Sequence, residues 1–133
     1  MNTDQTIDRI LAMSTIAVVG LSPKEERASN EGARYLLDHG YRIIPVNPGQ
    51  EEILGQQCYP NLAAIDKPVD VVDVFRRPEH CPPIAEEAVA IGAKALWLQL
   101  GIVSDEAARI ATAGGLLVVM DHCIKIEHEQ RVG

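Results

Sequence analysis

The loop after the first apolar run carries the residues best suited to holding a phosphate. Residues 20–30 read GLSPKEERASN and lead directly into a helical pattern. Backbone N–H groups in the first turn of a helix attract anions, and Lys24 or Arg27 can add positive charge. We therefore expect an anion-binding loop here. The alternative is an ordinary surface loop before a helix that Ser29 caps.

The end of the second strand pattern bears on which nucleotide such a loop would hold. That strand runs into Val46, Asn47 and Pro48, with no carboxylate. A dinucleotide fingerprint needs GxGxxG and an acid at this position to bind the ribose diol, and both are missing. Ordinary NAD use is therefore disfavoured. The proline-bounded turn offers a flat rim for an adenine, although the same residues are also typical of a strand terminator.

Two adjacent arginines follow the third strand pattern. Arg76 and Arg77 come directly after Phe75 and are the most concentrated positive feature of the chain. A guanidinium offers a fork for phosphate oxygens and a plane that stacks on a base. The pair could equally be solvated beside Glu79, so both interpretations remain open.

The remaining reactive side chains form no recognisable catalytic or metal site. The string Asp121-His122-Cys123 places its histidine and cysteine on opposite sides of an extended chain, which argues against a dyad. We expect Cys123 to be a small buried residue. Widely spaced cysteines without a CxxC pair argue against a zinc knuckle or a disulfide framework. The sequence thus predicts no catalytic residue and no metal ligand.

Apolar strand patterns alternate with helical patterns along the whole chain. The expected strands are residues 16–20, 41–46, 69–75, 94–100 and 116–120, and the expected helices cover about 3–13, 30–39, 82–92 and 104–114. Nearly continuous apolar strands separated by helices are typical of a parallel sheet covered on both faces. We therefore predict one domain over residues 1–133, with a Rossmann-like, doubly wound α/β fold of about five parallel strands. Ligands of such folds lie at the carboxyl ends of the strands.

The composition of the chain excludes some classes of binding partner. The chain has 133 residues and a net charge of −7, with acidic balance in both halves and no basic run. Nucleic-acid binding is therefore not expected. The start of the sequence has no signal-peptide pattern, and no apolar run is long enough to span a membrane. We expect a cytoplasmic protein, for which a homodimer is plausible on general grounds.

Six motifs occur in an order that resembles a known family. They are VVGLS at 18–22, RASN at 27–30, PVNP at 45–48, DVFRRP at 73–78, WLQLGI at 97–102 and DHCIKIEH at 121–128. Together they resemble the small stand-alone CoA-binding proteins, which are related to the CoA-binding domain of the succinyl-CoA synthetase alpha subunit and other NDP-forming acyl-CoA synthetases. The resemblance implies coenzyme A as the ligand. The synthetases' phosphorylated histidine belongs to a second domain that this chain does not contain, so the ligase reaction is not implied.

The resemblance also implies positions for the parts of CoA. Its phosphates would lie near the first loop, its adenine and ribose near the second strand end, and its pantetheine near the fourth. The corresponding residues are Gly20, Leu21, Ser22, Arg27, Ser29 and Asn30 for the phosphates, Val46, Asn47 and Pro48 for the nucleoside, Phe75, Arg76 and Arg77 beside it, and Leu100 and Gly101 along the pantetheine. A secondary hypothesis places Cys123 near the CoA thiol, where the two could form a mixed disulfide.

Two other functions remain open at this point. One is an NAD(P)-dependent oxidoreductase, and the other is a Rossmann-like regulatory module that binds another protein. The sequence does not distinguish free CoA from an acyl-CoA as the ligand.

Overall fold

Five parallel strands form the centre of the molecule. The computed structural model describes residues 1–132, and its main sheet has the strand order β2-β1-β5-β6-β7. The strands are β1 (Thr15–Val19), β2 (Arg42–Val46), β5 (Val71–Val74), β6 (Ala95–Leu98) and β7 (Leu117–Val119). Nearly all their side chains are buried, as expected for a sheet covered on both faces. This architecture confirms the predicted Rossmann-like α/β fold.

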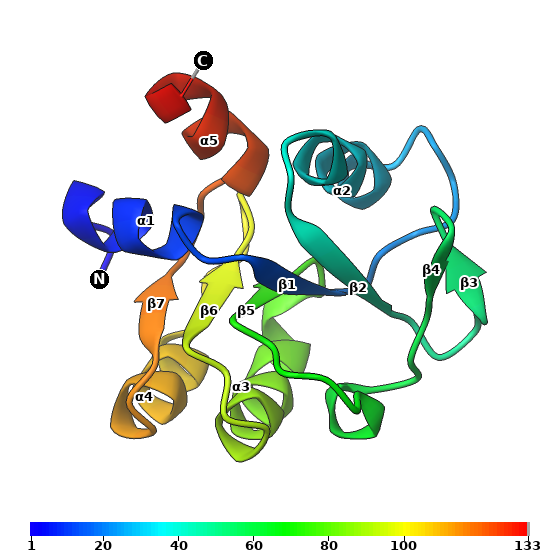
Figure 1. Cartoon of the computed structure of the whole chain (residues 1–133). Helices are drawn as coiled ribbons and strands as arrows, with labels where there is room; N and C mark the ends of the chain where they lie inside the picture. The colour runs from blue at the N-terminus through cyan, green and yellow to red at the C-terminus, as the bar shows by residue number, and fades with distance from the viewer. Residues whose placement is uncertain (133) are drawn as a thin grey trace.

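Helices cover both faces of the sheet (Figure 1). One face carries α1 (Asp4–Leu11), α2 (Ala28–Asp38) and α5 (Ile124–Val132), and the other carries α3 (Cys81–Ala90) and α4 (Asp105–Ala113). Alternate strand residues therefore enter two separate cores. Val18 and the fully buried Trp97 lie in the core beneath α1, α2 and α5, whereas Val19 and Leu98 lie in the core against α3 and α4.

Short elements close the edge of the sheet beside β2. A hairpin of β3 (Glu52–Ile53) and β4 (Gln56–Gln57) precedes the 3-10 helix η1 (Leu62–Ala64), and a second 3-10 helix, η2 (Pro78–His80), leads into α3. Tyr59 forms a parallel bridge with Val46. This bridge attaches the segment of Cys58 and Tyr59 to the edge of the sheet.

The first turns of α4 and α2 differ in how they are capped. Ser104 caps α4, because its hydroxyl accepts a hydrogen bond of 3.1 Å from the backbone N–H of Ala107. Ser29 does not cap α2. This helix begins at Ala28, and its N-cap residue is Arg27, whose side chain makes no capping bond. The Ser29 hydroxyl lies inside the first turn and bonds the preceding loop instead.

The chain direction across the sheet reverses between β1 and β5. From β1 the chain continues outward to β2, whereas β5, β6 and β7 follow one another on the other side. Loops that leave neighbouring strands in opposite directions open a crevice at the carboxyl edge of a sheet. The loops after Val19 and Val74 border this crevice.

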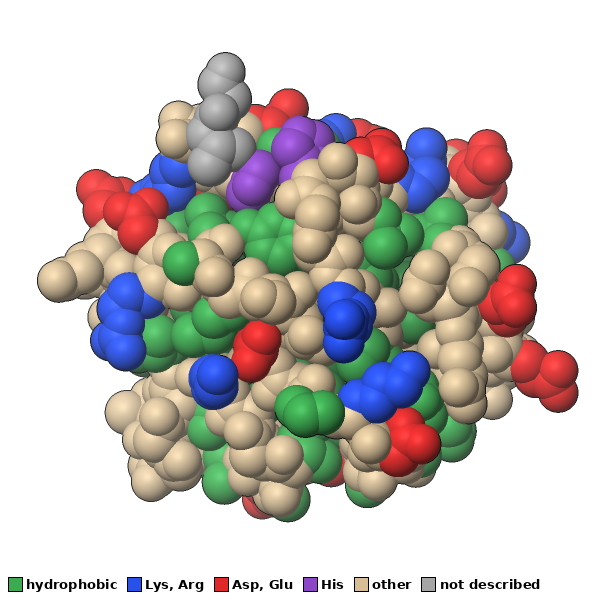
Figure 2. All heavy atoms as spheres, viewed as in Figure 1, with side chains coloured by type: hydrophobic (Ala, Val, Ile, Leu, Met, Phe, Trp, Pro, Cys, Tyr) green, Lys and Arg blue, Asp and Glu red, His purple; other side chains and the backbone are tan. Residues whose placement is uncertain are grey.

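The surface matches the acidic, mixed composition. On the face shown in Figure 2, cationic and anionic side chains are interspersed, and neither sign gathers into a large patch. In the described part of the chain, no helix has the length and apolar content needed to cross a membrane.

Candidate functional site

Two adjoining cavities lie at the crevice on the carboxyl edge of the sheet. The smaller has a volume of about 310 Å³ and lies over the start of α2. The larger has a volume of about 570 Å³ and lies between α2, the loops after β5 and β6, and the start of α5. Ala28 and Phe75 line both. One extended ligand could therefore occupy the two cavities together.

The smaller cavity has the chemistry of an anion site. Its wall contains Ser22 and two cationic side chains, Lys24 and Arg27. The first turn of α2, which has no side-chain cap, forms another part of the wall. Free N–H groups at a helix start, a hydroxyl and two cations are the donors that phosphate oxygens accept.

The loop over this cavity is held in shape by its own side chains. The backbone N–H of Ser22 donates to Ser29 Oγ at 3.0 Å, and Asn30 Nδ2 donates to the carbonyl of Ser22 at 2.9 Å. Asn30 Oδ1 in turn accepts from Arg34 Nε at 2.9 Å. Both Ser29 and Asn30 are buried. Their side chains therefore order the loop, while its outer groups remain available to a ligand.

Gly20 allows the loops after β1 and β5 to approach closely. Its φ is +87°, and a Cβ there would lie 2.6 Å from the carbonyl oxygen of Phe75 and 3.0 Å from Cδ of Arg76. No other residue type fits this position without moving the β5 loop. The stem of Arg76 consequently lies against the loop that follows β1.

Nine of the fourteen sequence-predicted residues line one or both of the two cavities. Gly20, Ser22, Arg27, Ser29 and Phe75 line the smaller one. The larger one is lined by Phe75, Arg76, Arg77, Leu100 and Gly101.

Five other predicted residues line neither of these two cavities: Leu21, Asn30, Val46, Asn47 and Pro48.

Asn47 connects the first two loops. Its Nδ2 donates to the carbonyl of the buried Leu21 at 3.0 Å, and its Oδ1 accepts from the backbone N–H of Gly49 at 2.9 Å. An aspartate could not make the first of these bonds, because a carboxylate has no hydrogen to donate. The residue that stands where NAD-binding proteins carry an acid therefore has a structural role between β1 and β2.

Helix α5 contributes to the site and is not predicted from the sequence. Cys123, Ile124, Lys125 and Ile126 line the larger cavity. The expectation that Cys123 is buried is wrong: it is half-buried, whereas Cys58 and Cys81 are buried. The missed signal is the spacing of Ile124 and His128, two buried residues four apart, which places both on one face of a helix.

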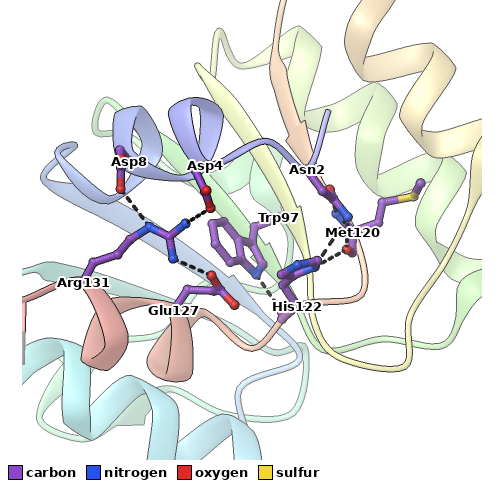
Figure 3. A network of polar contacts seen from close by, with 8 residues as sticks. All are labelled: Asn2, Asp4, Asp8, Trp97, Met120, His122, Glu127 and Arg131. Carbon is purple, nitrogen blue, oxygen red and sulfur yellow. Dashed lines mark hydrogen bonds and ion pairs between the residues drawn. The ribbon is translucent and has the colours of Figure 1, made fainter.

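A polar network anchors α5 and the segment before it (Figure 3). Arg131 pairs with Asp4 and Asp8 of α1, each at 2.7 Å, and with Glu127 at 2.6 Å. The indole Nε1 of Trp97 donates to the carbonyl of His122 at 2.8 Å. These contacts fix the position of the cavity wall that α5 provides.

The contact between α5 and α2 includes a histidine. His128 Nδ1 and the Tyr35 hydroxyl are 2.7 Å apart, and the ring of His39 stacks on Tyr35. Burial and the neighbouring His39 lower the pKa of His128 below its ordinary value. On the face shown in Figure 2, histidine side chains form one patch near the top of the molecule, where Figure 1 has α5 and α2.

A buried carboxyl group lies behind the floor of the larger cavity. Asp73 is 1% exposed and accepts a hydrogen bond from Gln99 Nε2. Gln99 Oε1 accepts from the backbone N–H of Ile124 at 3.3 Å, so the pair connects β5, β6 and the start of α5. Burial raises the pKa of Asp73 to about 7, and the bond from Gln99 opposes this only in part.

The other reactive groups have structural partners. His122 Nδ1 lies 2.8 Å from the carbonyl oxygen of Met120, and Asp70 accepts from the backbone N–H groups of Ser14 and Thr15. Within residues 1–132, no cluster of three histidine, cysteine or acidic side chains could hold a metal ion.

Comparison with known proteins relates this geometry to a family. Residues 14–129 match the model of the family described as CoA binding domain. The chain is 45% identical to the YneT protein of Bacillus subtilis (strain 168) over 113 residues, which cover 85% of this chain and 84% of that protein.

A solved structure and a larger enzyme are also similar. A hypothetical protein from Pyrococcus horikoshii OT3 has a TM-score of 0.94 and 41% identity, covering 98% of this chain and 93% of that one. The ADP-forming acetate–CoA ligase I of Archaeoglobus fulgidus is 25% identical over 128 residues. That match covers 89% of this chain but only 19% of the ligase.

Proposed function

This chain belongs to the CoA-binding domain family, and from that premise we propose that it is a cytoplasmic protein that binds coenzyme A or an acyl-CoA, without catalysis of its own. The observation that carries the proposal is the pair of cavities that share Ala28 and Phe75, the smaller with an anion site's chemistry and the larger mostly apolar. CoA has the same division, with phosphates at one end and a thiol-bearing arm at the other. The three free cysteines suit a reducing compartment.

We assign the diphosphate to the smaller cavity. Lys24 and Arg27 supply charge, and the first turn of α2 supplies N–H donors and the positive end of its dipole. The chain as a whole has an excess of acidic side chains, with a net charge of −7. Local donors must therefore hold an anion against the overall charge of the protein.

The nucleoside and the pantetheine arm are assigned to opposite sides of the diphosphate. Val46 ends β2, and Asn47 and Pro48 follow it beside the loop of residues 20–30; these three residues would form the rim for adenine and ribose. The arm would pass Phe75 toward Leu100 and Gly101 in the larger cavity. Arg76 and Arg77 line that cavity, and the stem of Arg76 packs on Gly20, so both arginines lie near the path of the ligand.

The ligase reaction is not part of the proposal. The chain corresponds to 19% of the Archaeoglobus ligase. The residues that line the two cavities contain no nucleophile paired with a base, which nucleophilic catalysis requires. The described residues supply groups that can bind a ligand, and binding is therefore the proposed activity.

A thermal-shift series with CoA, dephospho-CoA, NAD and NADP tests the proposal. A ligand at about 100 times its dissociation constant stabilises the fold by about 2.7 kcal/mol, which is several degrees for a domain of this size. We expect this shift with CoA. A shift with NAD and none with CoA would support the oxidoreductase alternative, and no shift with any nucleotide would favour an interaction module.

Charge variants make the test specific to the smaller cavity. Lys24→Ala and Arg27→Ala should each reduce the shift with CoA, because each removes a cation from its wall. Arg42→Ala removes an exposed arginine at the start of β2, on the opposite edge of the sheet, and is the matched control. An equal effect of all three variants would contradict the assignment of the phosphates.

A further inference from the structure

The larger cavity is more apolar than the arm of free CoA requires. Resting on the proposed function, we propose that the ligand is an acyl-CoA and that this cavity holds its acyl group. The thioester then lies close to Cys123, and the hydrocarbon lies between the β6 loop and α5.

The cavity wall presents hydrocarbon that would otherwise face water. Leu100 is 65% exposed and Ile126 is 43% exposed, and both line the cavity together with Phe75, Ile102 and Ile124. In the described chain, only two other large apolar side chains, Met1 and Val103, are comparably exposed. An apolar occupant would remove this surface from water, which is the main source of affinity for hydrocarbon.

Apart from Cys123 and the two arginines assigned above to the path of the ligand, the polar side chains that line the cavity are already paired. Both ends of the Gln99 amide are used, one by Asp73 and one by the N–H of Ile124. Glu31 pairs with Lys125 at 2.7 Å.

The β6 loop adds no free donor at Gly101, whose backbone N–H donates to Asp121 Oδ1 at 2.7 Å. Amide groups placed deep in the cavity would find few partners and lose the hydrogen bonds they make in water. A hydrocarbon chain has no such loss.

The size and position of the cavity fit the end of a thioester. Its volume of about 570 Å³ lies within the usual range of small-ligand pockets, roughly 300–1,000 Å³. An apolar cavity of ~150 Å³ already holds benzene, so this one has room for a chain of several carbons as well as the end of the arm. Ala28 and Phe75 connect it to the smaller cavity, so a ligand held there by its diphosphate directs its sulfur end here.

A chain-length series tests the proposal on the unmodified protein. Titration calorimetry would compare CoA with acetyl-, butyryl-, hexanoyl- and octanoyl-CoA. Each methylene that enters the cavity should tighten binding about fourfold, which is the ~0.8 kcal/mol of a buried methylene expressed as affinity. Equal affinities for CoA and hexanoyl-CoA would overturn the inference and leave the proposed function intact. Absence of binding by CoA and by every thioester would overturn both.

Variants at Cys123 test whether the acyl group lies in the larger cavity. Cys123→Phe fills part of the cavity and should weaken the binding of hexanoyl-CoA more than that of CoA, which removes the dependence on chain length. Cys123→Ser keeps the size of the side chain and should preserve that dependence. A Cys123→Phe protein that folds and still prefers hexanoyl-CoA would overturn the placement of the acyl group.

Alkylation of the native cysteine gives the same test if Cys123→Phe does not fold. Cys123 is half-buried, while Cys58 and Cys81 are buried, so iodoacetamide should modify Cys123 first. At equal saturation, hexanoyl-CoA should protect Cys123 more strongly than CoA does. Equal protection by the two ligands would contradict the proposal.

Discussion

Gly20 and Phe75 approach so closely that a single added carbon would force them apart. A Cβ on Gly20 would lie 2.6 Å from the carbonyl oxygen of Phe75. This contact joins the loop after β1 to the loop after β5 at the point where the strand order reverses. The geometry of the proposed phosphate site therefore depends on a residue without a side chain.

Gly20→Ala should destabilise the protein and weaken CoA binding. The substitution adds strain at a φ of +87° to the clash with Phe75, and we expect a loss of more than about 2 kcal/mol in the free energy of unfolding. Urea denaturation measures it. Gly40→Ala is the control, because Gly40 has a φ of +90° with nothing within 4 Å of the added carbon. Equal losses for the two variants would show that the loop contact contributes nothing.

Asp73 should make the stability of the protein fall as pH rises. Its pKa is about 7 in the fold and 3.8 as a free side chain. The folded state thus holds a proton that the unfolded state has released between these values. The stabilisation is complete below about pH 4 and is lost through pH 7, a change of roughly 4 kcal/mol.

Asp73→Asn isolates this effect, because an amide resembles the protonated acid and does not titrate. The difference in unfolding free energy between the wild type and Asp73→Asn, measured by urea denaturation from pH 4 to pH 8, should change in favour of the variant as pH rises. A constant difference over this range would contradict the assignment.

His128 should make α5 less stable as pH falls, which is the opposite of the effect of Asp73. Because burial lowers its pKa, the unfolded state binds a proton more readily than the folded state. The contribution of His128 is therefore present above its ordinary pKa of about 6.5 and is lost as pH falls through its lower folded value. On acidification, the protection of the α5 amides from hydrogen exchange should decrease more than the protection of the α3 amides. His128→Gln should remove this additional loss of protection. If the loss persists in the variant, another group is responsible for the pH dependence of α5.

Arg76 and Arg77 should both contribute to CoA affinity. Hydrogen bonds to charged groups are worth about 1.5–3 kcal/mol, so replacing both arginines by alanine should weaken binding at least roughly tenfold. Calorimetric titration of the double variant gives the value, with Arg42→Ala as the control. Unchanged affinity in the double variant would show that the two arginines only border the ligand.

The sheet was predictable because its strands are nearly continuous apolar runs separated by helical patterns. The position of residues 20–30 at the carboxyl edge of the sheet was predictable for a related reason, since a loop that follows a parallel strand and precedes a helix lies at that edge. Local sequence could not indicate that Ser29 bonds the N–H of Ser22 and does not cap the helix. That choice depends on how the whole loop closes.

Helix α5 and the larger cavity depend on contacts between distant parts of the chain. The ion pairs of Arg131 with Asp4 and Asp8 span nearly the entire sequence, and the segment that forms α5 has only a weak apolar pattern of its own. The bond between Gln99 and the N–H of Ile124 likewise exists only in the folded chain. Cavities formed between such elements have no local sequence signature.

The central claim is that CoA binds at the carboxyl edge of the sheet with its diphosphate over the start of α2. A titration of the ¹⁵N-labelled protein with CoA, followed by amide chemical shifts, tests this most directly. We expect the largest changes at residues 20–30, with further changes at Gly101 and Cys123. Changes confined to the opposite edge, around Arg42 and Lys94, or no change at saturating CoA, would contradict the account.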